Sequence, residues 1–245
     1  IASGEYVCYV DADDWIDSEM YMIMYNEGIE LGVDIVSVGI CRDFRNGTSY
    51  LEPNIIPQGI YRGEEIKNNI LPKVIDTDNF FQWGLSLSLC HYAFKKEILI
   101  HNQLVVDDRI QMGEDAACSI FCLYQCNSIA LIDRCLYHYR QSDSSMKRTS
   151  KKNSLERCQI LYRLMVERAS IFQEREVLLK KIDYMLFFAL LQSAYSVLLE
   201  GKSFLFPYRN VRKGENIVIY GAGIFGEEMY VTVKKTGFCN ITGWV

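Results

Sequence analysis

In GEYVCYVDADDWI, from Gly4 to Ile16, an apolar strand runs directly into a cluster of carboxylates. Asp11 and Asp13 lie two positions apart, so in an extended backbone both side chains point the same way and can reach one divalent cation. Acids this close repel one another unless a cation or a run of hydrogen-bond donors compensates their charge. The alternative is an aspartate-rich turn in which Asp14 or Asp17 caps the next helix.

The same string resembles the metal-binding signature of family 2 glycosyltransferases with the GT-A fold, through Gly-Glu-Tyr before the strand and Asp-x-Asp-Asp-Trp-Ile after it. In that family the D-x-D carboxylates hold manganese or magnesium against the diphosphate of a nucleotide sugar. The resemblance implies that Asp11 and Asp13 are the ligands of Mn²⁺ or Mg²⁺ and contact the donor through the metal. It also implies an α/β fold.

A second motif, Gly113-Glu114-Asp115, follows an irregular segment and opens the helical run AACSIFCLYQC. In the family this element supplies the general base, so the resemblance gives that role to Asp115 and a supporting role to Glu114. The chemistry agrees, because a sugar hydroxyl is a poor nucleophile and a nearby carboxylate can take its proton as the new bond forms. Taken alone, two acids here would be better explained by their favourable interaction with the dipole at a helix N-terminus.

A third, softer motif is LYHYR, from Leu136 to Arg140, with the serine-containing segment that continues to Met146. It resembles the strand and loop that follow the catalytic element in the family. The guanidinium of Arg140 suits a donor phosphate, and His138 is expected to reach the metal or the diphosphate. An ordinary surface or strand-packing role explains either residue equally well.

The resemblance begins inside the family's catalytic domain, because the elements that hold the uracil and ribose do not precede Gly4. We therefore expect residues 1–150 to be the C-terminal portion of a GT-A domain in a chain cut at both ends. Apolar residues at three- and four-residue spacing over 151–200 predict a helical extension of two helices. Residues 201–214, with Pro207 and several charges, predict a linker.

Residues 215–245 resemble the start of a Rossmann-like βαβ unit. A strand near 216–220 leads into G-x-G-x-x-G at Gly221, Gly223 and Gly226, and a helical run follows. Such a turn lets a phosphate approach a helix N-terminus closely. The acidic residue that would bind a ribose belongs beyond Val245, so nucleotide binding by this unit stays open.

Composition narrows the function classes. A chain of 245 residues with 49% hydrophobic content supports one sizeable core and a smaller unit. The net charge of −5 argues against nucleic acid as a partner. The nine cysteines are odd in number and form no C-x-x-C pair, which indicates a reducing compartment. For Cys118, Cys122 and Cys126, which share one helical stripe, we predict core packing.

The longest apolar run, Tyr184 to Leu199, is shorter than the roughly 20 residues needed to span a bilayer. We therefore predict a buried or interface helix in a cytoplasmic protein. Peripheral association with the inner face of the membrane stays open, because such enzymes often act on lipid-linked acceptors. A homo-oligomer is also expected, since a sheet without its first strands has unpaired edges.

Hydrophobic periodicity and turn residues predict the remaining elements. They are a strand at 5–10, a helix at 18–31 closed by Gly32, a strand at 34–40, a two-residue hairpin turn at Asn46-Gly47, a helix after Gly63, a helix from Gly113 to about 126 and strands at 128–132 and 135–139. Alternating strands and helices again predict an α/β fold.

Together these features predict a metal-dependent, inverting glycosyltransferase. It would move a sugar from a nucleotide sugar, expected to be a UDP-sugar, to a hydroxyl of a cell-surface glycan or lipid-linked acceptor. Asp115 would deprotonate that hydroxyl while the metal at Asp11 and Asp13 stabilises the departing diphosphate. Two other classes stay open: an NAD(P)-dependent oxidoreductase or epimerase built on the C-terminal glycines, and a non-catalytic scaffold with a degenerate transferase fold.

Overall fold

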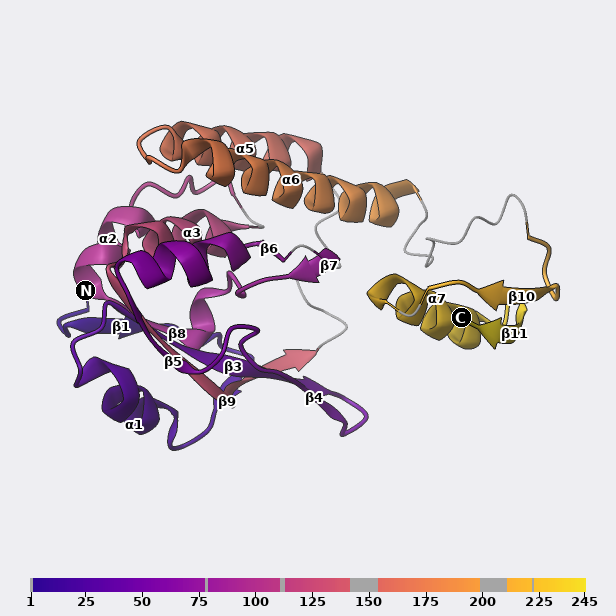
Figure 1. Ribbon diagram of the computed structural model, residues 1–245, viewed down its shortest axis with the longest axis horizontal. Coiled ribbons are helices and arrows are strands. Elements are labelled where there is room, and N and C mark those ends of the chain that lie inside the picture. Colours follow the sequence, from indigo (N-terminus) through magenta and orange to yellow (C-terminus); the bar gives the residue numbers. More distant parts are fainter. Residues whose placement is uncertain (1, 78, 111–112, 142–153, 199–210, 222) are drawn as a thin grey trace.

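A mixed sheet with helices on both faces forms the centre of the molecule (Figure 1). The computed structural model describes residues 2–77, 79–110, 113–141, 154–198, 211–221 and 223–245. Within them the main sheet has the strand order β1-β8-β3-β9-β2, with β4 added beside β3 and β5 beside β9. These strands are β1 (Tyr6–Cys8), β2 (Trp15–Ile16), β3 (Ile35–Phe44), β4 (Ser49–Glu52), β5 (Gly59–Arg62), β8 (Tyr92–Lys95) and β9 (Ser128–Gln141).

The two long strands β3 and β9 run parallel at the centre, and the other pairings in this sheet are antiparallel. The first seven residues of β3, IVSVGIC, are all buried, as expected for a strand covered on both faces. Ile35 pairs with Ile129, but the register shifts beside Gly39, and Cys41 then pairs with His138. The two predicted strands at 128–132 and 135–139 are therefore one strand, β9. The hydrophobic pattern predicts a break where the register of β9 with β3 shifts.

Different helices cover the two faces (Figure 1). On one face, α1 (Met20–Met24) continues into the π-helical turn η1 (Tyr25–Ile29) and packs with Val36 and Ala130. On the other, α3 (Glu114–Gln125) packs against Ile35 and Ile129, with α2 (Lys96–Gln103) beside it. The short elements are η2 (Ile66–Ile70), η3 (Leu71–Lys73), β6 (Asp76–Thr77), β7 (Asn79–Trp83) and η4 (Leu89–His91).

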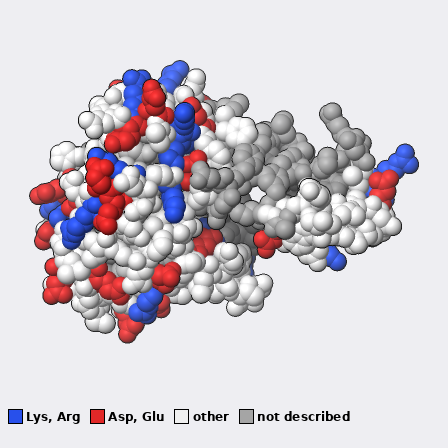
Figure 2. All heavy atoms as spheres, viewed as in Figure 1, with Lys and Arg blue, Asp and Glu red and all other residues white. Residues whose placement is uncertain are grey.

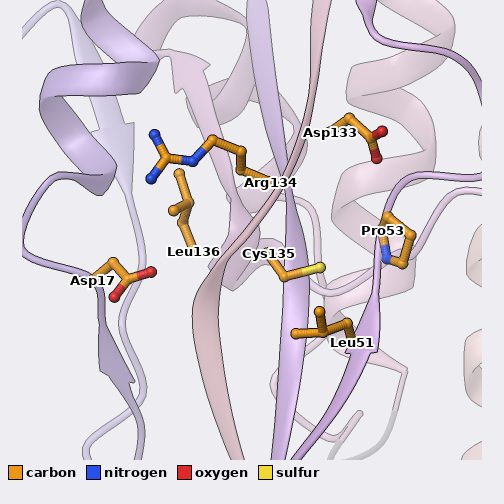
Figure 3. A pocket seen from close by; sticks show the side chains of 7 residues that line it. All are labelled: Asp17, Leu51, Pro53, Asp133, Arg134, Cys135 and Leu136. Atoms are coloured by element: carbon orange, nitrogen blue, oxygen red, sulfur yellow. The ribbon is translucent and has the colours of Figure 1, made fainter.

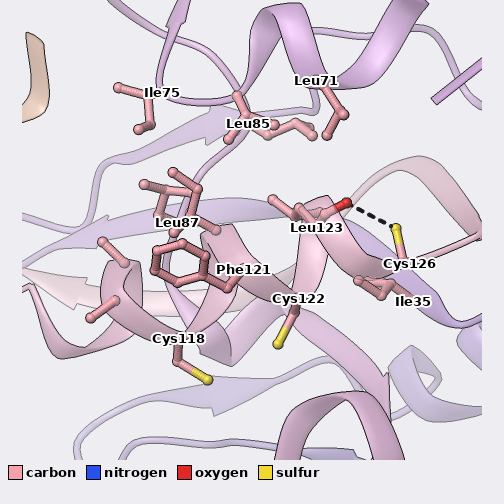
Figure 4. Close-up of a cluster of buried hydrophobic side chains, with 14 of the residues drawn as sticks. Ile35, Leu71, Ile75, Leu85, Leu87, Cys118, Phe121, Cys122, Leu123 and Cys126 are labelled. Atoms are coloured by element: carbon pink, nitrogen blue, oxygen red, sulfur yellow. Dashed lines mark hydrogen bonds between the residues drawn. The ribbon is translucent and has the colours of Figure 1, made fainter. Parts of the chain in front are cut away.

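The larger core lies around α3 (Figure 4). Phe121 and Leu123 are fully buried there, near Leu85 and Leu87. Three cysteine side chains of the same cluster are also buried, and all of them are free thiols: Cys118, Cys122 and Cys126. The prediction that this cysteine stripe packs in the core is confirmed.

Two antiparallel helices, α5 (Ser154–Ala169) and α6 (Arg175–Leu198), lie over α3 on the side away from the sheet (Figure 1). Arg168 of α5 joins them to α3, because its Nη1 donates to the Ala117 carbonyl at 2.8 Å and its guanidinium lies 3.9 Å from the centre of the Phe121 ring. On α6, buried Lys181 donates to the Pro72 carbonyl at 2.8 Å. Among the described residues, none of the helices combines the length and apolar composition required to cross a bilayer.

Near the C-terminus, the predicted βαβ unit forms from β10 (Asn216–Ile219), α7 (Ile224–Thr236) and β11 (Asn240–Trp244), whose two strands run parallel. Gly221 has φ +116°, and a Cβ on Gly226 would lie 1.8 Å from the Gly221 oxygen. These two glycines are thus required by the turn itself. Most of the predicted linker at 201–214 lies outside the described residues, as does the segment 142–146.

The predicted two-residue hairpin turn at Asn46-Gly47 is wrong in its length. The Gly47 N–H donates to the Phe44 carbonyl at 3.0 Å, and the Phe44 N–H donates to the Thr48 carbonyl at 2.9 Å. Only Gly47 in this turn has a positive φ, +81°. This is a three-residue loop with glycine in the left-handed position, a common alternative to the two-residue turn.

Candidate active site

The Asp-rich loop lies between β1 and β2. The Asp14 N–H donates to the Asp11 carbonyl at 3.1 Å, so the chain turns there before Trp15 pairs with His138 of β9. Asp11 and Asp13 are exposed, whereas Asp14 is partly buried. Two exposed carboxylates on one turn fit a hard divalent cation, because Mg²⁺ and Mn²⁺ prefer oxygen ligands and keep several waters.

Asp14 anchors this loop to β9. Its Oδ2 accepts a hydrogen bond from the Tyr137 hydroxyl at 2.7 Å, and its Oδ1 accepts one from the Arg140 N–H at 2.8 Å. The same Tyr137 hydroxyl accepts from the Asp11 N–H at 3.2 Å. Partial burial raises the pKa of Asp14, and the neighbouring charges of Asp13 and Asp11 add to the rise against these hydrogen bonds.

The capping alternative for these aspartates is wrong. Helix α1 begins at Met20, its N-cap residue is Glu19, and no side chain caps it. Neither Asp14 nor Asp17 therefore serves as its cap. The sequence did not predict that Tyr137 holds the Asp-rich loop. The one feature that pointed to this residue was its place within the LYHYR motif.

Asp115 occupies the first turn of α3. This helix begins directly after Gly113, which has φ +91°. Asp115 Oδ2 accepts hydrogen bonds from the Leu89 N–H and the Ser88 hydroxyl, each at 3.3 Å. Burial, with smaller contributions from the charges of Glu114 and Asp11, raises the pKa of Asp115 to about 6 against the lowering effect of the two hydrogen bonds. A carboxyl group with this pKa is well suited to accept a proton near neutral pH.

The two acidic motifs therefore share one electrostatic environment, although they lie far apart in the sequence. Asp11 acts on Asp115, and both act on Cys90, whose thiol pKa is raised to about 12 chiefly by burial. Cys90 is also a hydrogen-bond partner of Tyr137, the residue that holds the Asp-rich loop. Asp11 and Asp115 are thus close enough for the charge of Asp11 to raise the pKa of Asp115.

Glu114 lies beside Asp115 with one carboxylate oxygen, Oε2, buried. Within the described part of the chain this oxygen has no hydrogen-bond partner. A buried carboxylate oxygen without a donor costs free energy, so this position favours binding a hydroxyl or another donor.

His138 and Arg140 form an aromatic and cationic cluster with Trp15. The His138 ring stacks on Trp15 with centroids 5.0 Å apart and 12° between the planes, and the Arg140 guanidinium lies 5.2 Å from the Trp15 ring centre. The polar contacts of His138 are with Asp43, whose Oδ2 is 2.7 Å from His138 Nδ1, and with Asp17, whose Oδ1 is 3.7 Å from Nε2. Contact of His138 and Arg140 with a donor stays a prediction.

A shallow surface groove of about 420 Å³ lies next to this region (Figure 3). Residues from β4, β9 and the connections around them line it: Asp17, Leu51, Pro53, Asp133, Arg134, Cys135 and Leu136. The predicted catalytic and metal-binding carboxylates are not among them. In the view of Figure 2, basic and acidic side chains are interspersed over the exposed surface.

Comparison with known proteins identifies the class to which the chain is similar, the glycosyltransferases, although no family model matches it. In sequence, it is 21% identical over 155 residues to the uncharacterized glycosyltransferase EpsJ of Bacillus subtilis (strain 168), covering 63% of this chain and 43% of EpsJ. In structure, it is similar to S. aureus TarS 1–349 in complex with UDP-GlcNAc, with a TM-score of 0.57 and 15% identity over 80% of this chain and 52% of TarS.

A second TarS 1–349 structure gives a TM-score of 0.50 at 16% identity, over 85% of this chain and 50% of TarS. The chain thus spans about half the length of the proteins that it matches. The predicted resemblance to glycosyltransferases and the predicted partial GT-A fold are confirmed by these similarities.

Proposed function

We propose that this chain carries the metal and acceptor part of the active site of a nucleotide-sugar glycosyltransferase. The observation that carries the proposal is the meeting of the two acidic motifs. Asp115 has a pKa of about 6, and the charge of Asp11, which lies on the exposed Asp-rich loop, contributes to raising it. One carboxylate that can accept a proton, beside others that can bind a cation, is the set of groups that sugar transfer to a hydroxyl requires.

Asp115 is the general base in this proposal. The acceptor hydroxyl would bind at the N-terminal turn of α3, with Glu114 Oε2 as a second acceptor that orients it. As the hydroxyl oxygen attacks the anomeric carbon, its proton passes to the Asp115 carboxylate and the nucleoside diphosphate leaves from the opposite face. A single displacement of this kind inverts the configuration at the anomeric carbon.

Asp11 and Asp13 are the residues that would hold Mn²⁺ or Mg²⁺. A divalent cation bound there supplies charge stabilisation for the departing diphosphate. The fit rests on the oxygen chemistry of the two ligands and on their exposure, while Tyr137 and Asp14 keep the loop in place.

The donor is proposed to be a UDP-sugar. The TarS structure with a similar fold is a complex with UDP-GlcNAc, which supports this donor class. Arg140 is proposed to contact the diphosphate, since a guanidinium matches phosphate oxygens and the Trp15 ring already packs against this guanidinium. The proposed acceptor is a hydroxyl of a cell-surface glycan or a lipid-linked glycan, reached with peripheral association at the membrane.

The test is release of UDP from a panel of UDP-sugars in the presence of Mn²⁺, with and without added glycan acceptors, for the wild type and for Asp115→Asn. The asparagine is nearly isosteric but cannot take a proton, so turnover should fall by about 10²–10⁴-fold while the protein still binds UDP. Equal turnover in Asp115→Asn would remove Asp115 from the mechanism. Failure of the wild type to release UDP from every donor would reject the UDP-sugar assignment for this chain.

A further inference from the structure

A second group of potential metal ligands lies where the central strands β3 and β9 approach their ends. Cys41 and Asp43 come from β3, and His138 comes from β9. One ligand atom from each of the three lies within 4.8 Å of the others, a combination that the described residues show once. The set contains sulfur, oxygen and nitrogen donors, unlike the all-carboxylate pair of Asp11 and Asp13.

The backbone fixes the relative positions of these three residues. Cys41 is the direct partner of His138 in the parallel register, and Asp43 is two positions further along the same strand. Because successive side chains of a strand alternate between faces, Cys41 and Asp43 point the same way. A site supported by the two central strands of a sheet is held more rigidly than one on a loop.

The side-chain distances are already close to those of a metal site. The Asp43 carboxylate has its Oδ2 at 2.7 Å from His138 Nδ1 and its Oδ1 at 3.6 Å from Cys41 Sγ. Ser49 also donates to Asp43 Oδ1 and thereby helps to hold the carboxylate. Cys41 is 4% exposed, and the side chains of His138 and Asp43 are 19% and 17% exposed. The group is therefore sheltered but still open to solvent.

We propose that Cys41, Asp43 and His138 bind a zinc ion at a site distinct from Asp11 and Asp13. Zinc accepts thiolate, imidazole and carboxylate ligands together, whereas Mg²⁺ and Mn²⁺ favour oxygen. Tetrahedral zinc with ordinary bond lengths separates such donor atoms by about 3.3–3.6 Å. The distance from Cys41 Sγ to Asp43 Oδ1, 3.6 Å, already fits. The 2.7 Å contact to His138 Nδ1 is made by the other carboxylate oxygen, Oδ2, so the Asp43 carboxylate has to rotate to present one oxygen to the ion.

The surroundings of His138 match a metal-bound imidazole. When Nδ1 binds the ion, Nε2 carries the proton, and Asp17 Oδ1, now 3.7 Å away, has to move closer to accept a hydrogen bond from it. A carboxylate behind a metal-bound histidine is a common way to fix its tautomer and ring orientation. Trp15 stacks on one face of the same ring. A water molecule would complete the fourth position, and the Cys41 thiol releases its proton on binding.

The bound ion would tie β3 to β9 just before β9 continues to Tyr139 and Arg140. The proposal does not rest on the glycosyltransferase assignment, because it concerns metal affinity and the stability of the sheet. Its measurable consequences are one zinc ion per folded chain and a higher unfolding temperature with zinc than after treatment with a chelator.

The test is titration of the chelator-treated, full 245-residue chain with Co²⁺, followed by displacement with Zn²⁺. A thiolate bound to Co²⁺ gives a charge-transfer band in the near ultraviolet, which the proposal expects at one ion per chain. Cys41→Ser should abolish the band, whereas Cys135→Ser on the neighbouring part of β9 should keep it. Asp17→Asn should weaken zinc binding by about 10- to 100-fold.

Further variants separate this site from the proposed active site. Asp13→Ala should bind zinc like the wild type, and circular dichroism of the metal-free variants checks that each one folds. Retention of the charge-transfer band in folded Cys41→Ser, its absence in the wild type, or its loss in Asp13→Ala would each overturn the proposal. None of these readouts depends on glycosyl transfer, so failure of the zinc site and failure of the proposed function are distinguishable.

Discussion

At the scale of single residues, the proton acceptor sets the expected pH dependence. The pKa of Asp115 is raised to about 6, first by burial and then by Glu114 and Asp11. The base has to be ionised to take a proton, so the transfer rate should rise with pH through about 6 and level off above it. The measurement is the rate at saturating donor from about pH 5 to 8.

A rate that is flat across this range would contradict the role of Asp115. As a control, Asp133→Ala replaces an exposed acid outside the site and should keep the same pH profile as the wild type.

Buried His91 predicts an effect on stability. Burial lowers its pKa to about 4, against hydrogen bonds to backbone carbonyls that include that of Val38. At a pH between this pKa and the pKa of about 6.5 in the unfolded chain, the unfolded chain binds a proton at His91 that the folded chain does not. The free energy of unfolding therefore falls as the pH falls. The loss reaches roughly 3 kcal/mol when the full window is crossed. Asp115 acts in the opposite sense, because its folded pKa is raised and the folded state takes up the extra proton.

Replacing His91 with asparagine isolates the histidine contribution. Asn keeps a donor near the Val38 carbonyl but does not titrate, so the variant should be less stable than the wild type at neutral pH, and this difference should shrink near pH 5. Urea denaturation at both pH values measures it. A difference that is the same at both would show that His91 does not control acid sensitivity.

At the scale of elements, Tyr137 connects the Asp-rich loop to β9. Its hydroxyl donates to Asp14 and accepts from the Asp11 N–H. Tyr137→Phe leaves both groups without this partner, which should cost about 1–3 kcal/mol of unfolding free energy and weaken Mn²⁺-dependent UDP binding. Chemical denaturation and calorimetry measure the two effects. Tyr50→Phe, on the exposed hairpin, is the matched control and should change neither.

The start of α3 depends on Gly113. Its φ is +91°, and a Cβ there would lie 2.6 Å from Leu161 of α5. Gly113→Ala should therefore destabilise the fold by about 1–3 kcal/mol from backbone strain, with an added clash, and should lower transfer by displacing Asp115. Gly47→Ala is the control, since Gly47 has φ +81° but open space around it. Thermal unfolding of both variants tests the difference.

The clash can be tested separately. Adding Leu161→Ala should relieve part of the effect, so the double variant should be more stable than the sum of the single effects predicts. Simple additivity would contradict close packing between Gly113 and Leu161.

Local signals explain which elements the sequence could predict. Gly113 with two acids after it marks the start of α3, and the spacing of apolar residues defines α5 and α6. The roles of Tyr137 and Asp14 could not be predicted, because they depend on the register between the Asp-rich loop and β9, which local patterns do not contain. The meeting of Cys41, Asp43 and His138 has the same origin, since it follows from the shifted register of β3 and β9.

At the scale of the whole molecule, the partial GT-A fold was predictable because its motifs are short and their residues contiguous. That the charge of Asp11 acts on Asp115 is a result of chain topology, since β1 and α3 are brought together by β8 and β3. From the sequence, the proximity of Asp11 and Asp115 was implied only by the family resemblance. The chain covers 43% of EpsJ and about half of TarS, and both acidic motifs lie within it.

Metal-dependent donor binding can be measured by calorimetric titration of UDP into the protein with and without Mn²⁺, for the wild type, Asp13→Ala and the control Asp133→Ala. We expect that UDP binds only with Mn²⁺, that Asp13→Ala abolishes this binding and that Asp133→Ala preserves it. UDP binding that needs no metal and is unchanged in Asp13→Ala, or the absence of UDP binding under every condition, would contradict this expectation.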